Sequence, residues 1–372
     1  MNEKFPINPP ARPPLPRDPV ADEALQRPDW TVRQRETQGV LALDKNENTD
    51  PGLQRLVAEV IAGVPISASL EYPECAPYYD LLADHLGVVP ANLLFTAGSD
   101  GAIRSVFEAF LAPGETVVQT MPSFAMFELY TRMYGGKTHA LAYEATAQGP
   151  KLEAEKISEA LALVRPRIMC LPNPDSPTGT LFQAEDLERI VAAAAAVDCV
   201  ALIDEAYYPF SSVSALGLIG RYPNLVIART FSKVWGIAGL RLGFAGAHPE
   251  MTALLHKVRP MYEVNGLALA AMASLIESAD EVMAAAARIN AGKDYFLARM
   301  QGLRLRTLDC AGNFVHVDFG DARDAVHARL TGKVLYKPSF GDACLASFSR
   351  FTTAPKETMA ALSDIIEGAL KG

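Results

Sequence analysis

The sequence predicts an α/β fold, with a mainly parallel central sheet in a large domain and a smaller α+β domain. The chain has 372 residues, of which 49% are apolar, and it exceeds the size at which a single hydrophobic core usually stops growing. Short β-rich segments alternate with helical patterns through most of the chain, which favours crossover connections between parallel strands. A later helical stretch is followed by three further strand-like segments, which indicates the second domain.

The alternation of strands and helices begins near residue 93. Each expected strand is a short apolar run, and polar or glycine-containing turns separate the runs from the helices. The expected strands are LLFT (93–96), TVVQ (116–119), RIMCL (167–171), CVALID (199–204), NLVIART (224–230) and RLGFAGA (241–247). Helices are expected over 100–111 and 184–197, the second of which carries a run of alanines.

The C-terminal part begins with a helical stretch over 267–301. FVHVDF (314–319) alternates like a half-exposed strand, and KVLYKP (333–338) and ASFSRFTT (346–353) also have strand character. Residues 1–20 contain seven prolines, so we expect neither a helix nor a central strand there. The expected parts are a proline-rich N-terminal arm (1–30), a large domain (66–256), and a small domain formed by 31–65 and 257–372.

Composition excludes several classes of function. The net charge of −9 and the pI near 5.3 argue against nucleic acid and anionic membranes as partners, because both attract basic surfaces. No apolar run approaches the roughly 18 residues that span a membrane. The N-terminus lacks the basic segment and apolar core of a secretory signal, so we expect a cytoplasmic protein.

The cysteines and histidines do not form a recognisable metal or disulfide pattern. Five cysteines are scattered without a C-x-x-C, and no H-E-x-x-H is present. Cys170, Cys199 and Cys344 lie in or beside apolar stretches and are expected to be buried thiols. We expect no bound metal.

The segment TFSKVWGIAGLRLGF (230–244) carries the strongest chemical signal. A strand ends near Thr230, and Ser232, Lys233 and, eight residues later, Arg241 follow. A lysine amine can form a Schiff base with an aldehyde, while a hydroxyl and a planar guanidinium can bind a phosphate. The alternative is a surface lysine beside a structural arginine.

A second segment, ALIDEAYYPF (201–210), places Asp204 at the carboxyl end of an expected central strand. Ligands of open α/β sheets bind outside these strand ends. A carboxylate there can pair with a protonated ring nitrogen of a ligand, and Tyr207 can give its phenol to an oxygen of the same ring. An aspartate that caps the next turn is the alternative.

Three further segments follow expected strands. The turn TAGSDGAI (96–103) offers the free amides of Ser99 and Asp100 at the start of a helix, where an anion is favoured, and Gly98 permits close backbone approach. A plain helix cap is the alternative. Phe124 in MPSFAMF can stack on a ligand ring, although a core aromatic is the alternative. LPNPDSPTGTLF (171–182) is a turn after an apolar strand.

Taken in order, these segments resemble the class I/II aminotransferases of the fold-type I group of pyridoxal 5′-phosphate (PLP) enzymes, and within them the histidinol-phosphate aminotransferase-like subgroup. The resemblance covers roughly residues 40 to 370. Its motifs are LDKNENTDPG, EYPEC, the Gly-Ser-Asp turn, PNPDSPTG, DEAYY, TFSK, GLRLGF and SRFTT. It implies PLP as cofactor and a fold-type I PLP-dependent transferase fold.

The resemblance also implies roles for individual residues. Lys233 would hold PLP covalently and move the proton between the α-carbon and C4′ of the cofactor. Asp204 would pair with the pyridine nitrogen, and Tyr207 with the ring oxygen. The phosphate would be held by Gly98, Ser99, Asp100, Ser232 and Arg241, and Phe124 would occupy the stacking position.

Substrate and partner contacts are implied in the same way. Arg350 would bind the substrate carboxylate or an equivalent anionic group, with Asn46 of LDKNENTDPG beside the substrate. Tyr72 of EYPEC would reach the phosphate of the neighbouring subunit's cofactor, which implies a homodimer with shared active sites. Glu263, in a loop expected near the partner's active site, would favour a cationic substrate, or else face solvent.

The chain departs from the family pattern at two places. Ser176 stands where relatives usually carry an asparagine that bonds the ring oxygen. Ser176 and Asn173, which lies at the start of the same loop, are expected to be cofactor-binding residues. Tyr336 stands where histidinol-phosphate enzymes carry an arginine for the substrate phosphate, and it is expected to be a substrate-binding residue. Both departures favour a specialised biosynthetic role.

The implied activity is ping-pong transfer of an amino group between an amino acid, or an amino-alcohol phosphate, and a 2-oxo acid. One alternative is a PLP-dependent decarboxylase of a phosphorylated amino acid, since such enzymes share these motifs. Another is a non-catalytic regulatory protein on the same scaffold, although the intact lysine, aspartate and arginine argue against it.

Overall fold

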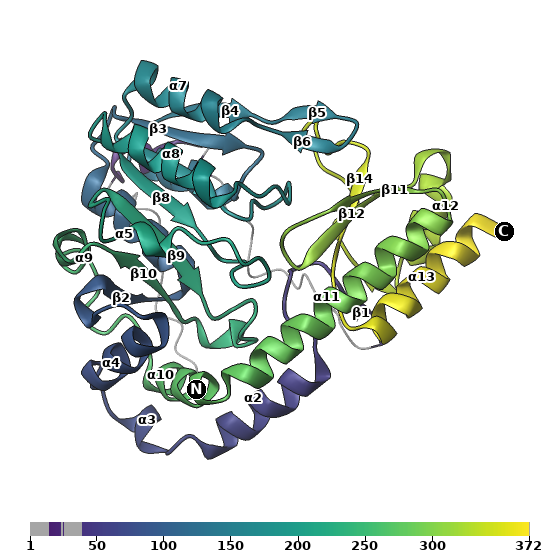
Figure 1. The fold of residues 1–372 in the computed structure, drawn as a ribbon, viewed down its shortest axis with the longest axis horizontal. Helices are drawn as coiled ribbons and strands as arrows, with labels where there is room; N and C mark the ends of the chain where they lie inside the picture. Colours follow the sequence, from purple (N-terminus) through teal and green to yellow (C-terminus); the bar gives the residue numbers. More distant parts are fainter. Residues whose placement is uncertain (1–14, 24, 26–38, 372) are drawn as a thin grey trace, which may run out of the picture.

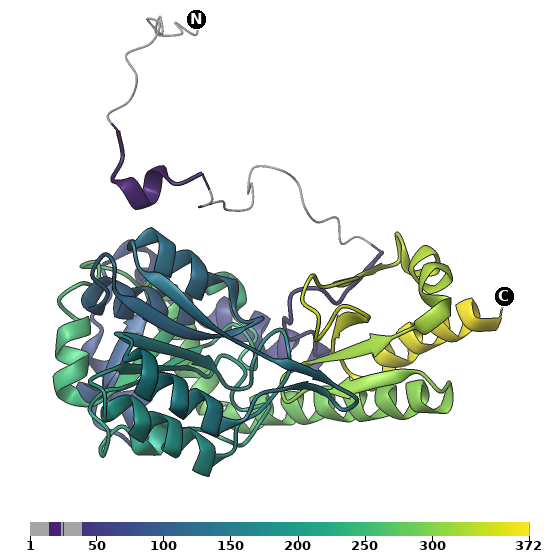
Figure 2. The same ribbon diagram turned by 90° about the horizontal axis from the view of Figure 1, so that it is seen from above.

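The computed structural model describes residues 15–23, 25 and 39–371. Figure 1 shows a large lobe built on a seven-stranded sheet and a second lobe built on a three-stranded sheet. Figure 2 shows the two lobes from above, with the long helix α11 (Ala279–Gly302) running from the large lobe along the second one. This helix joins the two lobes along one side of the molecule.

The central sheet has the strand order β2-β10-β9-β8-β7-β3-β4. β10 runs antiparallel to both of its neighbours, and the remaining neighbours in the sheet pair in parallel. The predicted α/β fold with a mainly parallel central sheet is therefore confirmed. The strands are β2 (Leu93–Thr96), β3 (Thr116–Met121), β4 (Lys137–Ala142), β7 (Ile168–Pro172), β8 (Val200–Asp204), β9 (Leu225–Thr230) and β10 (Gly243–Ala247).

Helices cover both faces of this sheet because side chains alternate between the faces along each strand. In β8, Val200 and Leu202 pack in a core with α5, α6 and α9, whereas Ala201 and Ile203 pack in another core with α7 and α8. Burial on both faces explains the almost continuous apolar strands. The helices are α5 (Gly98–Phe110), α6 (Ala125–Met133), α7 (Ala154–Val164), α8 (Ala184–Ala195) and α9 (Pro249–Leu255).

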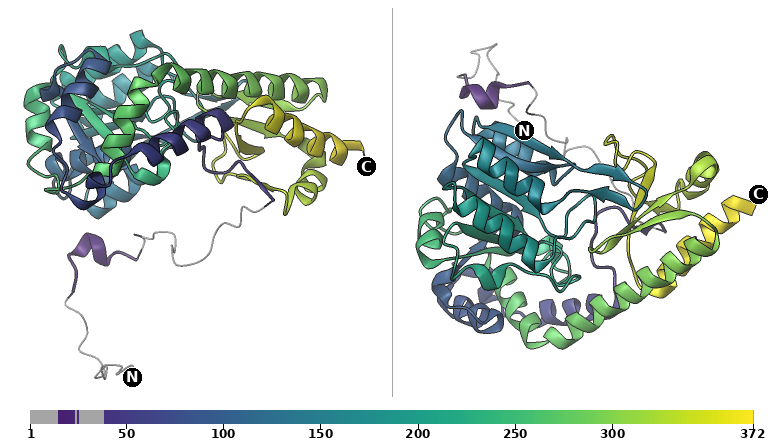
Figure 3. Two further views of the ribbon diagram at one scale, coloured as in Figure 1. Left: turned by 90° about the horizontal axis from the view of Figure 1, so that it is seen from below. Right: turned by 45° about the horizontal axis from the view of Figure 1, so that its top comes forward.

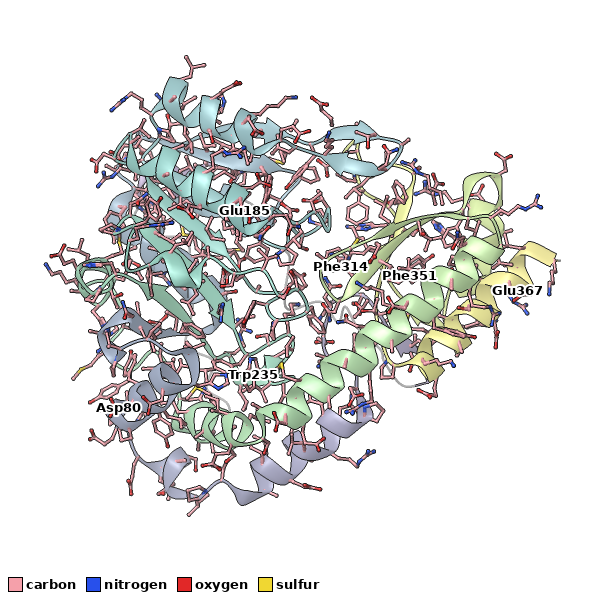
Figure 4. All side chains as sticks on the ribbon, viewed as in Figure 1. Asp80, Glu185, Trp235, Phe314, Phe351 and Glu367 are labelled. Carbon is pink, nitrogen blue, oxygen red and sulfur yellow. The ribbon has the colours of Figure 1, made fainter. Side chains whose placement is uncertain are left out.

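A third core joins the remaining helices to the edge of the large lobe. Leu269 and Met272 of α10 pack in it with Phe95 of β2 and with Trp235, which Figure 4 labels beside α10 and α11. Helix α10 also contacts α2, α3 and α4. The bounds are α2 (Pro51–Gly63), α3 (Ser67–Leu70), α4 (Ala76–Leu86) and α10 (Gly266–Glu277). Thus α10 packs with the large lobe, while the predicted boundary at residue 257 stays a prediction.

The second lobe contains the antiparallel sheet β11-β12-β14. Helices α11 and α13 pack against each other beside it, as Figure 3 shows, and Phe314 and Phe351 project from its strands (Figure 4). The bounds are β11 (Arg306–Asp309), β12 (Phe314–Asp318), β14 (Phe348–Thr352), α12 (Arg323–Leu330) and α13 (Lys356–Lys371). A separate parallel pair joins β1 (Leu41–Ala42) to β13 (Val334–Leu335). A segment that precedes the large lobe in the sequence therefore belongs to the second lobe.

A hairpin of the large lobe reaches the second lobe. It consists of β5 (Glu144–Thr146) and β6 (Gly149–Lys151), and its Thr146 carbonyl accepts a hydrogen bond of 2.8 Å from Nη2 of Arg306. This hairpin, β4 and β11 were not expected from the sequence. Their segments mix charged and apolar residues, as is usual for strands at the margin of a sheet.

Two expectations were wrong, and a third was confirmed with a break. Asp18–Ala21 forms a short helix, α1, because Pro19 occupies its first turn, where no N–H is needed; residues 1–14 lie outside the described residues. The expected helical stretch over 267–301 is confirmed and consists of two helices that meet at Ser278. β12 is buried on both faces from Phe314 to Val317, because one face packs on α11 and α13 and the other on a cluster around Tyr207.

Other features can be stated for the described part of the chain. No helix there is long and apolar enough to cross a membrane. No group of three or more His, Cys, Asp or Glu side chains there is arranged to hold a metal ion. The five cysteines are free thiols, and the expected burial of Cys170, Cys199 and Cys344 is confirmed.

A buried ion pair holds the loop after β8 to β9. Both oxygens of Glu205 are engaged: Oε2 accepts from Nε and Nη2 of Arg229 at 3.0 and 2.8 Å, and Oε1 accepts from the Ala215 amide at 2.6 Å. Arg229 is only 7% exposed at its side chain, and its guanidinium lies 3.8 Å from the Tyr208 ring centroid. The pair therefore fixes the backbone that follows Asp204 at the carboxyl end of β8.

Replacing Arg229 with alanine is expected to lower the free energy of unfolding by about 3–5 kcal/mol, because the buried Glu205 carboxylate loses its partner. Urea denaturation of the variant and the parent protein measures this difference. The matched control is Lys371→Ala, which removes an ion pair whose lysine side chain is 72% exposed; its effect should stay below about 1 kcal/mol. Equal effects of the two substitutions would contradict the structural role of the buried pair.

Candidate active site

The carboxyl ends of the parallel strands meet at one edge of the central sheet, and a cavity of about 350 Å³ opens there. β8 ends at Asp204, β9 is followed by Ser232 and Lys233, and α5 begins directly after β2. The cavity brings together most of the residues expected from the sequence. These are Asn46, Ser99, Asp100, Phe124, Ser176, Asp204, Tyr207, Ser232, Lys233, Arg241 and Arg350.

Lys233 is half-buried at the wall of the cavity. Its Nζ donates a hydrogen bond of 2.8 Å to the carbonyl of Lys45 and lies 5.7 Å from the centroid of the Tyr207 ring. The Tyr207 hydroxyl accepts a hydrogen bond of 2.8 Å from Nδ2 of Asn46. The phenol hydrogen is thus left to donate to an oxygen of a bound ligand.

Asp204 is buried, and its Oδ1 accepts a hydrogen bond of 3.1 Å from the Ala206 amide. Burial raises the pKa of Asp204 to about 7, and the negative charges of Asp100 and Glu205 add to this increase, while Lys233 opposes it. A carboxylate in this setting is stabilised by a cation that comes close to it. The protonated pyridine nitrogen of PLP is such a cation.

The opposite end of the cavity is built to hold an anion. Helix α5 directs its first amides, at Ser99 and Asp100, toward the cavity, where the helix dipole favours negative charge. Arg241 lies against this turn, with Nη1 3.4 Å from Oγ of Ser232. A Cβ added to Gly98, whose φ is +77°, would lie 2.8 Å from Nη2 of Arg241. The glycine therefore leaves room for the guanidinium, and this end of the cavity fits the phosphate of PLP.

The loop after β7 presents Ser176 to the cavity but not Asn173. Both polar atoms of the Asn173 side chain bond the backbone of Phe182. Nδ2 donates to its carbonyl at 3.1 Å, and Oδ1 accepts from its amide at 2.8 Å. Asn173 is fully buried and does not line the cavity. Asp175, also buried, accepts hydrogen bonds from Tyr143 and Thr178. The expected cofactor contact of Asn173 is therefore corrected. Its side chain instead joins the start of the loop that carries Ser176 to the backbone of Phe182.

Arg350 reaches the cavity from β14 of the second lobe. Its Nη2 donates a hydrogen bond of 3.0 Å to the carbonyl of Asp44, and its guanidinium lies 5.4 Å from the centroid of the Phe314 ring. Nε of Arg350 is buried and has no hydrogen-bond partner among the described residues. Part of the guanidinium is thus available to an anionic ligand.

Besides Gly98 and Asn173, three further residues expected at the site do not line this cavity. Tyr72 is 73% exposed, and its ring stacks on Tyr262 with centroids 4.0 Å apart. Glu263 lies behind the start of α5, with Oε1 3.4 Å from the Ala97 amide. Tyr336 stacks on Phe351 with centroids 4.8 Å apart. The predicted substrate contact of Tyr336 is corrected, because its ring packs on Phe351 outside the cavity. Glu263 was expected near the partner's active site, and that stays a prediction.

The structure also adds residues that were not expected. Lys45 and Thr230 line the cavity. Lys45 lies within LDKNENTDPG, one of the motifs that carried the resemblance. Its place in this motif, next to Asn46, could have indicated that it lies at the site.

A family model described as aminotransferase class I and II matches residues 39–366. The chain is 35% identical over 361 residues to histidinol-phosphate aminotransferase 2 of Burkholderia pseudomallei (strain 1710b), which covers 95% of this chain and 97% of that protein. The crystal structure of a putative histidinol-phosphate aminotransferase from Erwinia carotovora atroseptica SCRI1043 is 25% identical, with a TM-score of 0.79 over 90% of this chain and 97% of that one.

A third similar structure is L-threonine-O-3-phosphate decarboxylase from Porphyromonas gingivalis. It is 20% identical, with a TM-score of 0.74 over 90% of this chain and all 100% of that one. At this identity the similarity shows a shared fold and nothing about the reaction.

A mainly parallel sheet with a lysine, a buried aspartate and an anion-binding helix start at its carboxyl edge defines a PLP-dependent enzyme of fold type I. The match over residues 39–366 then fixes the family: the chain belongs to the class I and II aminotransferases. The predicted resemblance, the PLP cofactor and the enzymatic character are confirmed. The alternative of a non-catalytic regulator is not supported by these relatives.

Proposed function

We propose that the chain moves an amino group from an amino acid, or from an amino-alcohol phosphate such as histidinol phosphate, to a 2-oxo acid by a ping-pong reaction through Lys233. The observation that supports this most is the cavity itself. It combines Lys233, buried Asp204 and a partly unpaired Arg350, each from a different segment of the chain. The names of similar proteins support the donor class.

In this proposal Lys233 holds the cofactor and, once displaced by the donor, takes the proton from the donor α-carbon. When bound, PLP supplies a protonated ring that accepts the electron pair left by this proton. Asp204 keeps the ring nitrogen protonated, because its own charge is otherwise buried at a cost. Tyr207, held by Asn46, donates to the ring oxygen, and Phe124 covers one face of the ring.

The phosphate end and the substrate end have separate sets of residues. Gly98, Ser99, Asp100, Ser232 and Arg241 bind the phosphate. Arg350 binds the substrate carboxylate or an equivalent anion, and Asn46 lies beside it. Ser176 offers a hydroxyl where the resemblance leads one to expect an amide, so Tyr207 would supply the main contact to the ring oxygen.

We also propose a cytoplasmic homodimer in which Tyr72 reaches the partner's cofactor phosphate. Exposed apolar side chains support a contact surface around Tyr72. They include Ile66, Leu70, Met261 and Tyr262, whose exposed fractions are 74%, 76%, 77% and 50%. Two domains divided as expected, with 66–256 as the large one and 31–65 with 257–372 as the small one, are part of the same proposal.

An absorbance titration tests the reaction. The cofactor band of the purified protein is expected to shift to shorter wavelength on addition of an effective donor, such as glutamate or histidinol phosphate, and to return on addition of 2-oxoglutarate. Product analysis should show one 2-oxo product for each amino group transferred, without release of carbon dioxide. Carbon dioxide release without amino transfer would instead establish the decarboxylase alternative.

A further inference from the structure

The segment 44–46 forms part of the cavity wall. Consecutive residues of this segment contact the side chains of Arg350 and Lys233. The Asp44 carbonyl accepts from Arg350, and the Lys45 carbonyl accepts from Nζ of Lys233. Lys45 and Arg350 both line the cavity. The side chain of Lys45 therefore starts from a backbone position between the lysine and the arginine of the site.

The backbone around Lys45 is held firmly. The Asn46 amide donates a hydrogen bond of 2.9 Å to Oγ1 of Thr352, and its carbonyl accepts one of 3.1 Å from Nδ2 of Asn313. Asn46 has φ of 55°, in the left-handed region, and is 2% exposed. Lys45, by contrast, is exposed next to it. A side chain that is free while its backbone is anchored can adjust to a ligand without moving the wall of the site.

The charges that line the cavity are unevenly distributed. Four side chains are cationic, namely Lys45, Lys233, Arg241 and Arg350, and two are anionic, Asp100 and Asp204. In the proposed function the cofactor would account for most of them: Arg241 would hold its phosphate, Asp204 would pair with its ring nitrogen, and Lys233 would hold it covalently. Asp100 accepts a hydrogen bond of 3.1 Å from the Tyr130 hydroxyl. Lys45 and Arg350 remain for the substrate.

The ammonium of Lys45 forms no ion pair with any residue in the ranges 15–23, 25 and 39–371. Arg350 likewise has no carboxylate partner in these ranges, since its Nη2 donates to the backbone carbonyl of Asp44. A single carboxylate would neutralise only one of these two cations. A ligand with two negative charges at this end matches both of them.

We propose that Lys45 is a specificity-determining residue that binds a second negative charge of the substrate, next to the one bound by Arg350. The proposal rests on the proposed amino transfer and narrows its substrate class to donors or acceptors with a doubly anionic end. Two sources share this chemistry: a dicarboxylate, with one carboxylate on each cation, and a phosphate monoester, whose dianion contacts both.

The test compares Lys45→Met and Lys45→Arg with the parent holoenzyme. The donors are glutamate, histidinol phosphate and leucine, whose side chain is neutral. Lys45→Met is expected to raise KM about 10-fold for a doubly anionic donor, as for the loss of one charge-assisted hydrogen bond, with kcat changed less than about 2-fold. KM for leucine should stay unchanged, and Lys45→Arg should restore most of the loss.

Lys333→Met is the matched control. Lys333 is exposed near β13 and does not line the cavity, so the same change of charge there should leave every KM unchanged. A KM effect for glutamate alone assigns the second charge to a dicarboxylate, and an effect for histidinol phosphate alone assigns it to a phosphate. Equal effects on leucine and on the anionic donors would overturn the proposal. So would a fall in kcat at constant KM, which places the effect at Lys233.

Equilibrium binding separates this proposal from the proposed function. Calorimetry of succinate binding to the holoenzyme is expected to give a Kd about 10-fold weaker for Lys45→Met than for the parent or for Lys333→Met. The difference should shrink with added salt, because Lys45 is exposed. This measurement needs no turnover. Loss of amino transfer would overturn the proposed function while the succinate result still decides the role of Lys45, and an unchanged Kd overturns that role.

Discussion

Replacing Lys233 with alanine is expected to lower kcat by at least about 10³-fold, as for loss of a positioned proton-transfer group that also holds the cofactor. Nζ of Lys233 lies at the cavity wall, within 2.8 Å of a backbone carbonyl and near the Tyr207 ring. Among the described residues, the only other lysine that lines the cavity is Lys45, whose backbone carbonyl accepts the hydrogen bond from Lys233. Steady-state assays with the donor found by titration measure the loss.

The absorbance spectrum distinguishes the causes of that loss. The Lys233→Ala variant should still bind PLP through Arg241 and the α5 turn, but its cofactor band should differ from that of the parent because the covalent link is absent. The matched control is Lys257→Ala, an exposed lysine outside the cavity, with activity close to the parent. Transamination by Lys233→Ala at a rate near that of the parent would refute the assignment of this residue.

Replacing Asp204 with asparagine is expected to lower kcat by roughly 10²–10³-fold, the range seen when a preorganised charge partner is removed from an active site. The amide cannot keep the pyridine nitrogen protonated, so the ring accepts the electron pair less readily. The binding of PLP should weaken less than the rate falls, since the phosphate contacts are unchanged. Steady-state kinetics at saturating PLP and a PLP titration measure the two effects separately.

The same substitution should stabilise the cofactor-free chain at neutral and alkaline pH. Burial raises the pKa of Asp204 to about 7 from its ordinary value of 3.8, so the folded state holds more protons than the unfolded state between these values. The contribution of Asp204 to the free energy of unfolding is therefore most favourable below pH 4, and it falls as the pH rises toward 7. Asparagine removes this loss, which is on the order of 2–4 kcal/mol from the size of the shift.

Denaturation of the cofactor-free proteins at several pH values tests the sign. Asp175, whose pKa burial raises to about 6, contributes a similar trend to both proteins, so their difference isolates Asp204. The advantage of Asp204→Asn should grow from pH 5 to pH 8. An advantage that stays constant over this range would show that Asp204 does not titrate there.

The central sheet was largely predictable because its local signals agree with its tertiary environment. β2, β3, β7, β8, β9 and β10 all lie within two residues of the expected bounds. Each is an apolar run buried on both faces, so the sequence of each strand reflects its burial directly. The margins were less predictable: β4 alternates exposed and partly buried residues, and the β5–β6 hairpin is stabilised by contact with β11 rather than by its own composition.

The site was predictable where a residue's position along a strand determines its position in space. Asp204 and Lys233 follow parallel strands, and the carboxyl ends of such strands meet at one edge. Asn173 was assigned wrongly because its sequence neighbours do not show that its amide bonds the backbone of Phe182. Tyr336 was misplaced because its partner, Phe351, comes from a strand 15 residues later in the chain.

By itself the sequence determined the fold class and the likeness to aminotransferases, and it predicted Lys233, Asp204 and Arg241 as residues that the structure brings to one cavity. These depend on local runs and on spacings within single segments. Only the tertiary structure decided that Lys45 lines the same cavity as Arg350, that Asn173 lies outside this cavity, and that Glu205 pairs with Arg229. Each of these depends on segments far apart in the chain, and their contact follows from packing the two lobes together rather than from any local preference.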